Sequence, residues 1–550
     1  MSPTADLVLT GGPVHTVDPA RSRATSVAVR NGRIAAVGHD EVRELIGPRT
    51  EVVDLKGRLL LPGFQDAHVH PQGAGLELGL CHLADTTDPA EYLRRIKEYA
   101  DRNPDAEWIT GGGWSLEAFP GGAPTAEALD AIVPDRPVFL PNRDHHGAWV
   151  NSRALERAGI DARTPDPADG RIERDADGNP TGMLQEGAVH LVGKLVPDPT
   201  PEDQLAALLR AQAVLHSYGV TAWQDAIVGA YANMADPAPS YLAALDQGLL
   251  TARVVGALWW DRERGAEQIP ELIARREELH RGRFRAGTVK VMQDGIAENH
   301  TAAMLTPYLT GCGCSSDNSG ISFVDPGELK KYVTELDASG FQVHFHALGD
   351  RAVREALDAV ESARTANGWR DTRHHLAHLQ VVHPQDVPRF RALGASANLQ
   401  MLWAAHEPQM DELTLPFLGA ERGARQYPFG DLLRAGATLA AGSDWPVSSP
   451  DPFQAIHVAV NRVSPGAPEG TPEFLPGQRL DLGTALAAYT AGSAHVNHLD
   501  DITGSITAGK SADLVVLDRD PFAGPPEEIA ATRVLETFVE GRRVHTADDA

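Results

Sequence analysis

The sequence has few cysteines, few positive charges and no long apolar run. Its three cysteines, an odd number in 550 residues, cannot form a disulfide framework, which fits a reducing compartment. The formal net charge of −26 argues against binding to nucleic acid or to an anionic membrane surface. No apolar run approaches the ~18 residues of a membrane span, and the first residues lack the features of a signal peptide. We therefore expect a cytoplasmic protein.

Both ends of the chain have the pattern of short β-strands. The first 60 residues contain four such runs and the last 50 contain two (6–9, 26–30, 33–37, 51–54, 512–517 and 534–539). Asn31-Gly32 is a strong signal for a type I′ hairpin, and Glu540-Gly541 marks another turn. We expect the two termini to meet in one small β-domain, formed by residues 1–60 and 500–550.

The middle of the chain alternates apolar, strand-like runs with helical stretches (202–218, 328–339, 352–367 and 431–435). This alternation indicates βα units and a parallel sheet or barrel, here over residues 61–499. Residues from about 72 to 200 break the rhythm and are rich in Gly, Pro and Asp. They are interpreted as an insertion after the first barrel strand.

The run from Leu59 to Pro71 carries the most informative local signal. An apolar stretch and a Pro-Gly break lead into His68-Val-His70, which predicts a buried strand that ends in two imidazoles. Side chains at positions i and i+2 of a strand point to the same side, so both rings can hold one metal ion. Imidazole suits Zn, Fe, Ni or Cu. His68 and His70 alone are as consistent with a chance occurrence as with a metal site, so a metal-site prediction needs further ligands elsewhere in the chain.

Five later segments also have the form of a strand that ends in polar groups. In chain order they offer Lys290 with Asp294, His344 with His346, His374 with His378, Gln400 with Trp403, and Asp444. In a parallel barrel these ends converge on the face where barrel enzymes keep their chemistry. The joint pattern therefore predicts a metal centre much more specifically than any single member does.

These segments resemble the amidohydrolase superfamily, and within it the family 3 branch that includes the N-substituted formamide deformylases. The similarity extends over nearly the whole chain and includes residues 57–71, His346 to Asp350, Gly442-Ser-Asp444 and residues 504–517. The resemblance implies a (β/α)8 TIM barrel and a small β-sandwich made from both termini. It also implies one or two divalent metal ions, with zinc as the first candidate.

The resemblance also implies a role for each histidine at a strand end. His68 and His70 would bind one metal together with Asp444, which would also act as the general base. His346 and His378 would bind the second metal. His344 and His374, one layer deeper, are better explained as hydrogen-bonded core groups.

Lys290 stands where many relatives carry a lysine that CO2 carbamylates and that bridges two metals. Carbamylation needs a neutral amine, so burial must lower the lysine pKa. Lysine supplies only seven of the 49 basic residues, and one inside an apolar strand mildly favours this role. The alternative is an ordinary salt bridge to Asp294.

Three further features have competing explanations. Asp350 is expected to cap the helix that follows it rather than to orient His346. The pair Cys312-x-Cys314 lies among Gly and Ser, which favours a loop over a metal site. Within the insertion, residues 142–152 resemble a segment that closes over the site, with His146 rather than His145 facing the substrate. The remaining substrate-binding candidates are Trp114, Gln400, Trp403 and Trp445, although aromatic residues more often belong to the core.

The predicted reaction is hydrolysis of a non-peptide C–N bond in a small amide or formamide. A metal-activated water would attack the carbonyl carbon, with Asp444 moving the proton and His146 or His378 as an additional donor. The alternatives are a mononuclear deaminase or cyclic-amide hydrolase on the same barrel, and a catalytically silent metal-binding or regulatory protein. We expect a small-molecule amide substrate, no nucleic acid and no membrane partner, and a homodimer is one assembly open to the chain.

Overall fold

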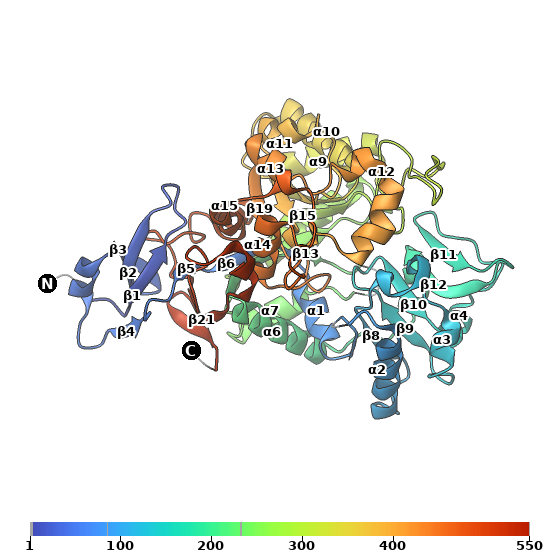
Figure 1. The fold of residues 1–550 in the computed structure, drawn as a ribbon, viewed down its shortest axis with the longest axis horizontal. Coiled ribbons are helices and arrows are strands. Elements are labelled where there is room, and N and C mark those ends of the chain that lie inside the picture. The colour runs from blue at the N-terminus through green and yellow to red at the C-terminus, as the bar shows by residue number, and fades with distance from the viewer. Residues whose placement is uncertain (1–3, 85, 232–233, 549–550) are drawn as a thin grey trace.

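Three β-sheets organise the chain in the computed structural model, which describes residues 4–84, 86–231 and 234–548. The terminal sheet, the barrel and the insertion lie in a row from left to right (Figure 1). No helix among these residues is both long and apolar enough to cross a membrane.

The central sheet is a nearly closed, parallel barrel of eight strands. Its strands are, in spatial order, β6 (Phe64–Val69), β13 (Val220–Val228), β14 (Arg253–Trp259), β15 (Phe284–Met292), β16 (Gln342–Ala347), β17 (His375–His378), β18 (Ser396–Leu399) and β19 (Thr438–Ala441). Two main-chain hydrogen bonds join the last strand to the first, from Asp444 N to His68 O at 2.8 Å and from His70 N to Trp445 O at 2.9 Å. The predicted barrel is confirmed, and its seam passes through the predicted metal ligands.

Helices follow the strands and cover the barrel. They are α6 (Pro201–Ser217), α7 (Ala238–Asp246), α8 (Ile269–Leu279), α9 (Pro326–Ala338), α10 (Asp350–Asn367), α11 (Val387–Leu393), α12 (Leu415–Gly423), α13 (Phe429–Arg434), α14 (Pro452–Asn461), α15 (Leu482–Ala487) and α16 (Ser493–Val496). The start of α6 is set by a capping box between Thr200 and Asp203, with Pro201 in the first turn. The four predicted helices correspond to α6, α9, α10 and α13, with ends that differ by at most two residues.

Strands from both termini form one continuous sheet beside the barrel (Figure 1). They are β1 (Leu7–His15), β2 (Arg23–Arg30), β3 (Arg33–Gly38), β4 (Glu51–Asp54), β5 (Leu60–Pro62), β20 (Leu514–Leu517), β21 (Val534–Val539) and β22 (Arg542–Thr546). The two ends of the chain meet where β5 pairs with both β1 and β20. Asn31 and Gly32 both have positive φ, at 50° and 73°, as a type I′ turn requires.

The segment between β6 and β13 is an ordered layer with its own sheet. After α1 (Pro71–Glu77) come β7 (Cys81–His82), α2 (Pro89–Arg102), β8 (Ile109–Gly112), α3 (Ala126–Asp130), β9 (Val138–Pro141), β10 (Gly147–Val150), α4 (Ser152–Ala158), β11 (Gly170–Arg174), β12 (Pro180–Glu186) and α5 (Val189–Gly193). Trp114 and Trp149, both fully buried, belong to an apolar core that this layer shares with barrel loops, for example with Ile296 and Leu348. This layer corresponds to the insertion expected at about 72–200.

Candidate metal centre and its cavity

The ends of β6 and β19 bring His68, His70 and Asp444 to one point. The Asp444 Oδ1 atom lies 3.1 Å from His68 Nε2 and 3.0 Å from His70 Nε2. Ligand atoms that share a metal at about 2 Å are separated by about 3 Å, so these distances fit a common ion. Among the described residues, this is the one group of three His, Cys, Asp or Glu side chains with metal-site spacing.

The close contact at the barrel seam depends on Gly442 and Asp66. A Cβ atom on Gly442 would come within 2.7 Å of the His68 main-chain nitrogen, so only glycine lets the two strand ends approach. The buried Asp66 carboxylate accepts from His68 N at 2.9 Å and from Ser443 N at 3.1 Å. Asp66 was missed by the sequence analysis, although it lies two residues before His68.

The ring nitrogens of His378 are buried without hydrogen bonds to the described protein. Neither nitrogen has a hydrogen-bond partner in the described chain, and Nδ1 lies 3.8 Å from Asp444 Oδ2. The ring stacks on Trp403, with centroids 5.4 Å apart and planes at 7°. Because buried polar atoms rarely lack partners, the donor set around Asp444 fits a bound metal.

The carboxylate that orients His346 belongs to Asp294. Asp294 Oδ1 lies 3.3 Å from His346 Nδ1, which leaves Nε2 as the free ring nitrogen. Three main-chain N–H groups fix the same carboxylate (Ala303, Leu348 and Gly349). The expected capping role of Asp350 is wrong, because Gly349 is the N-cap of α10 and the Asp350 carboxylate accepts from Leu305 N at 2.8 Å.

One small cavity, of about 60 Å³, is lined by all six predicted metal ligands: His68, His70, Lys290, His346, His378 and Asp444. Lys290 is buried on β15, and burial lowers its pKa to about 7 even though Asp444 opposes this shift. No ion pair joins Lys290 to Asp294 within the described ranges, where the Asp294 carboxylate instead accepts from main-chain N–H groups. The lysine thus has the burial and the lowered pKa that carbamylation needs.

A buried chain of hydrogen bonds fixes the ring orientation of His68. Gln342 on β16 donates from Nε2 to two main-chain carbonyls, at 2.7 and 2.8 Å, so its Oε1 must act as an acceptor. Gln224 on β13 donates to that oxygen at 3.2 Å and therefore turns its own Oε1 toward His344 Nδ1, at 2.7 Å. The His344 Nδ1 atom must then carry the proton.

The proton on His344 Nδ1 determines the tautomer of His68, which is a predicted metal ligand. With Nδ1 protonated, His344 Nε2 is an acceptor, and it lies 2.9 Å from His68 Nδ1. His68 therefore holds its proton on Nδ1 and keeps the Nε2 lone pair, which is the atom beside Asp444. His344 was predicted to be a core group, whereas nothing in the sequence marks Gln224, whose position on the facing strand only the barrel reveals.

His146 comes from the insertion and faces the barrel site. Its ring lies 5.4 Å from the ring of His346, and its Nδ1 lies 2.9 Å from Glu186 Oε2. Burial alone would lower the pKa of His146, but the Glu186 carboxylate outweighs this and raises it to about 9. His146 is therefore a charged donor at neutral pH. The neighbouring His145 instead pairs with Glu77 at 2.9 Å.

Several site residues have left-handed backbone conformations that are unfavourable for side chains other than glycine. These residues have positive φ: His145 at 63°, Glu186 at 51°, His378 at 79° and Asp444 at 56°. Each such residue costs about 1–3 kcal/mol and persists only where the surrounding structure imposes it. Non-glycine residues elsewhere in the chain share this conformation, so it does not by itself identify the site.

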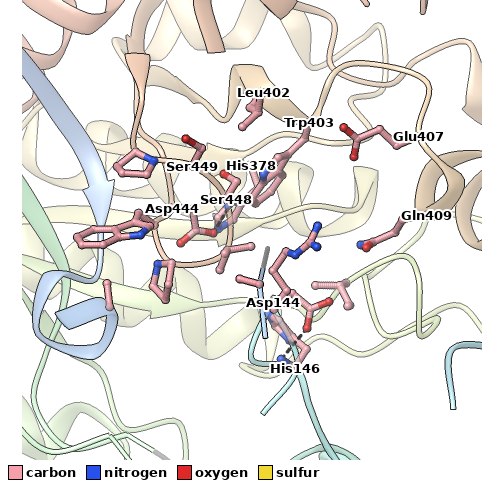
Figure 2. Close-up of a pocket in the computed structure, with 18 of the residues that line it drawn as sticks. Asp144, His146, His378, Leu402, Trp403, Glu407, Gln409, Asp444, Ser448 and Ser449 are labelled. Atoms are coloured by element: carbon pink, nitrogen blue, oxygen red, sulfur yellow. Dashed lines mark hydrogen bonds and ion pairs between the residues drawn. The ribbon is translucent and has the colours of Figure 1, made fainter. Parts of the chain in front are cut away.

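A larger cavity, of about 500 Å³, adjoins the metal centre (Figure 2). Trp403 and Trp445 line it, as do His146, His378 and Asp444. Trp114 lies outside it, fully buried, with its indole N–H donating to the main chain of β9 at 2.8 Å. Gln400 lies beneath the site, where its Oε1 accepts from His378 N at 2.6 Å.

Comparison with known proteins gives matches over nearly the whole chain. Residues 51–545 match the family described as "Amidohydrolase family". The chain is 32% identical to the Arabidopsis thaliana protein LONG AFTER FAR-RED 3, covering 98% of this chain and 92% of that protein. It is 28% identical to an N-substituted formamide deformylase of Arthrobacter pascens, covering 98% of both chains. An uncharacterized metal-dependent hydrolase from Pyrococcus horikoshii has a TM-score of 0.72 and 26% identity, covering 94% of this chain and 99% of that one.

Proposed function

The chain belongs to the amidohydrolase family, and from this premise we propose that it hydrolyses a non-peptide C–N bond of a small amide or formamide with the help of a divalent metal. One observation carries the proposal. Six potential metal ligands line one small cavity, which shares His146, His378 and Asp444 with the cavity large enough for a substrate. The likeness to an N-substituted formamide deformylase supports formamides as the first substrates to test.

The metal, with zinc as the first candidate, would be held by His68, His70 and Asp444. A second ion would use His346 and His378, and a carbamate on Lys290 would supply further oxygen ligands. A metal at this site supplies Lewis acidity, which polarises a carbonyl and makes a nearby water more acidic. The orphaned nitrogens of His378 and the neutral lysine favoured by burial support this arrangement.

The protein's own residues would position the substrate and move the protons. Asp444 takes a proton from the attacking water and returns it to the leaving nitrogen. His146, charged because of Glu186, donates a hydrogen bond to the carbonyl oxygen as negative charge develops there. Trp403 and Trp445 provide apolar surface for the substituent on the nitrogen.

The main alternative is a mononuclear deaminase or cyclic-amide hydrolase on the same barrel. It is favoured by one observation, that His68, His70 and Asp444 are the one three-membered ligand group in the described residues. Metal analysis and intact mass separate the two: two ions per chain with a carbamate adduct support the dinuclear form, and one ion without the adduct supports the alternative.

The decisive experiment is a screen of amides and formamides with metal-reconstituted protein, run beside the Asp444→Asn variant. Metal-dependent release of amine that the variant lacks would support the proposal. Turnover of deaminase substrates alone would favour the alternative. If the reconstituted protein turned over none of these compounds, the remaining explanation would be a metal-binding or regulatory protein.

A further inference from the structure

Arg143 stands on a tightly fixed turn between β9 and β10. Its main-chain N–H donates to Trp114 O at 2.8 Å. Asn142 exchanges two hydrogen bonds with Gly147 across the turn, both at 2.9 Å. The same turn carries His146, three residues after Arg143, so the backbone positions of the two residues are held in a fixed relation.

The Arg143 guanidinium has no hydrogen-bond or ion-pair partner within the part of the chain that the structure describes, although it interacts electrostatically with Glu407 and acts to lower the pKa of that carboxyl. It is the one lysine or arginine among the residues that line the 500 Å³ cavity. The carboxylates in that lining already have partners of their own: Glu77 with His145, Asp144 with His146 N, Glu298 with Thr414, and Glu407 with Ser464. The guanidinium thus presents five N–H donors to the cavity, and no acceptor among the described residues forms a hydrogen bond with them.

The carboxylates that line the cavity leave the hydrogen-bond donors of Arg143 available to a ligand. None of them forms an ion pair with Arg143 among the described residues. Burial raises the pKa of Glu298 and of Glu407, and at Glu407 it outweighs the opposite effect of Arg143, which lessens the opposition of both carboxyls to a bound anion. Glu407 lies on the far side of the cavity from Asp444 (Figure 2). Arg143 lines the same cavity as His146 and Asp444, so a substrate bound at the metal centre can meet the guanidinium.

We propose that Arg143 binds a carboxylate of the substrate, so that the preferred substrates are amides or formamides that carry a carboxylate close to the amide nitrogen, as N-formyl amino acids do. A guanidinium matches a carboxylate with two parallel, charge-assisted hydrogen bonds. This inference rests on the proposed C–N hydrolysis, since it names the substrate class of the same site. Arg143 is a specificity-determining residue in this assignment.

The test compares two substrates that differ only in the carboxylate, N-formyl-leucine and N-formyl-isoamylamine. With the metal-loaded full chain, we expect a higher kcat/KM for N-formyl-leucine. In Arg143→Gln, the ratio of the two kcat/KM values should fall about 10- to 100-fold, the effect of losing hydrogen bonds to a charged group. The loss should lie mainly in KM, since such a contact binds ground state and transition state alike.

Two further variants test whether the change in substrate preference comes from the Arg143 side chain. Arg143→Lys should restore part of the preference, because lysine keeps the charge but loses the bidentate geometry. Arg153→Gln is the matched control: Arg153 lies on the exposed surface of the same insertion, in a salt bridge to Glu156 at 2.8 Å. Its substrate ratio should equal that of the wild type.

A binding readout separates this inference from the proposed reaction. The carboxylate 4-methylpentanoate should raise the Tm of the metal-loaded wild type and of Arg153→Gln more than that of Arg143→Gln. If neither formamide is hydrolysed, the proposed function fails, and this titration alone decides the role of Arg143. Equal Tm shifts in the wild type and Arg143→Gln, or an unchanged substrate ratio, would overturn the proposal.

Discussion

The hydrogen-bond chain behind His68 predicts that a residue with no contact to the metal controls metal affinity. Gln224 Oε1 accepts from His344 Nδ1 at 2.7 Å and from His375 Nε2 at 3.0 Å. Gln224→Met has a similar volume but no acceptor. The His344 ring then loses the constraint on its tautomer, and with it His68 loses the preference for a free Nε2.

The expected magnitude has two parts. Each buried N–H left without an acceptor costs about 1–3 kcal/mol, and Gln224→Met leaves two, so the free energy of unfolding should fall measurably. Partners behind a metal-binding histidine typically change metal affinity or activity by about 10- to 100-fold, and we expect the same loss of affinity here.

The assay measures metal retention against a competing chelator and, separately, urea unfolding. Gln212→Met is a matched control, because Gln212 is also buried and also accepts two N–H groups, from Thr251 and Ala252. Both variants should lose stability, but only Gln224→Met should lose metal affinity. Gln224→Glu keeps the acceptor and should retain more affinity than the methionine variant.

Equal metal affinity in Gln224→Met and Gln212→Met would refute this reasoning. The tautomer of His68 would then be set by Asp444 and the metal alone. Nitrogen-15 NMR of the imidazoles gives a direct check, since the wild type should show His68 protonated on Nδ1 before metal is added.

Four other perturbations have defined outcomes. Asp444→Asn should lower turnover by about 100- to 10,000-fold, measured as amine release, and full turnover would disprove its proton-transfer role. Gly442→Ala should push His68 out of position and lower turnover about 100-fold, while unchanged activity would show that the strand ends can separate at little cost. Glu186 raises the pKa of His146 to about 9, so the stability from this pair is fully present below about pH 6.5 and is lost as pH rises through 9. Glu186→Gln should abolish this alkaline loss in unfolding curves, and an identical pH profile would contradict the pairing. Chelation should lower Tm, and restored metal should recover it, if the ligands hold an ion in the folded state.

Much of the barrel could be predicted from local patterns. The apolar runs that end in His70, His346, His378 and Asp444 give strand positions, and parallel strands in a barrel place their C-terminal ends on one face. The hairpin at Asn31-Gly32 was equally local, because its positive φ values follow from the residue types. Such features depend on neighbours in the sequence.

The supporting residues could not be found in this way. Gln224 and Gln342 are unremarkable glutamines until β13 and β16 face each other across the barrel interior. Asp294 rather than Asp350 orients His346, because the loop after β15 folds back onto the next strand end. The insertion contains more regular secondary structure than its Gly and Pro content indicated, because several of its strands pair with strands that are distant in the sequence.

The sequence by itself determined the chemistry available to this protein: imidazoles, a carboxylate and one buried lysine at the ends of predicted strands. Only the tertiary structure decided how they act together. Closure of the barrel at Gly442 sets the 3 Å spacing around Asp444, the buried amides set the His68 tautomer, and the turn at 142–147 brings His146 and Arg143 to the cavity. Those distances arise between residues far apart in the chain, and only packing can fix them.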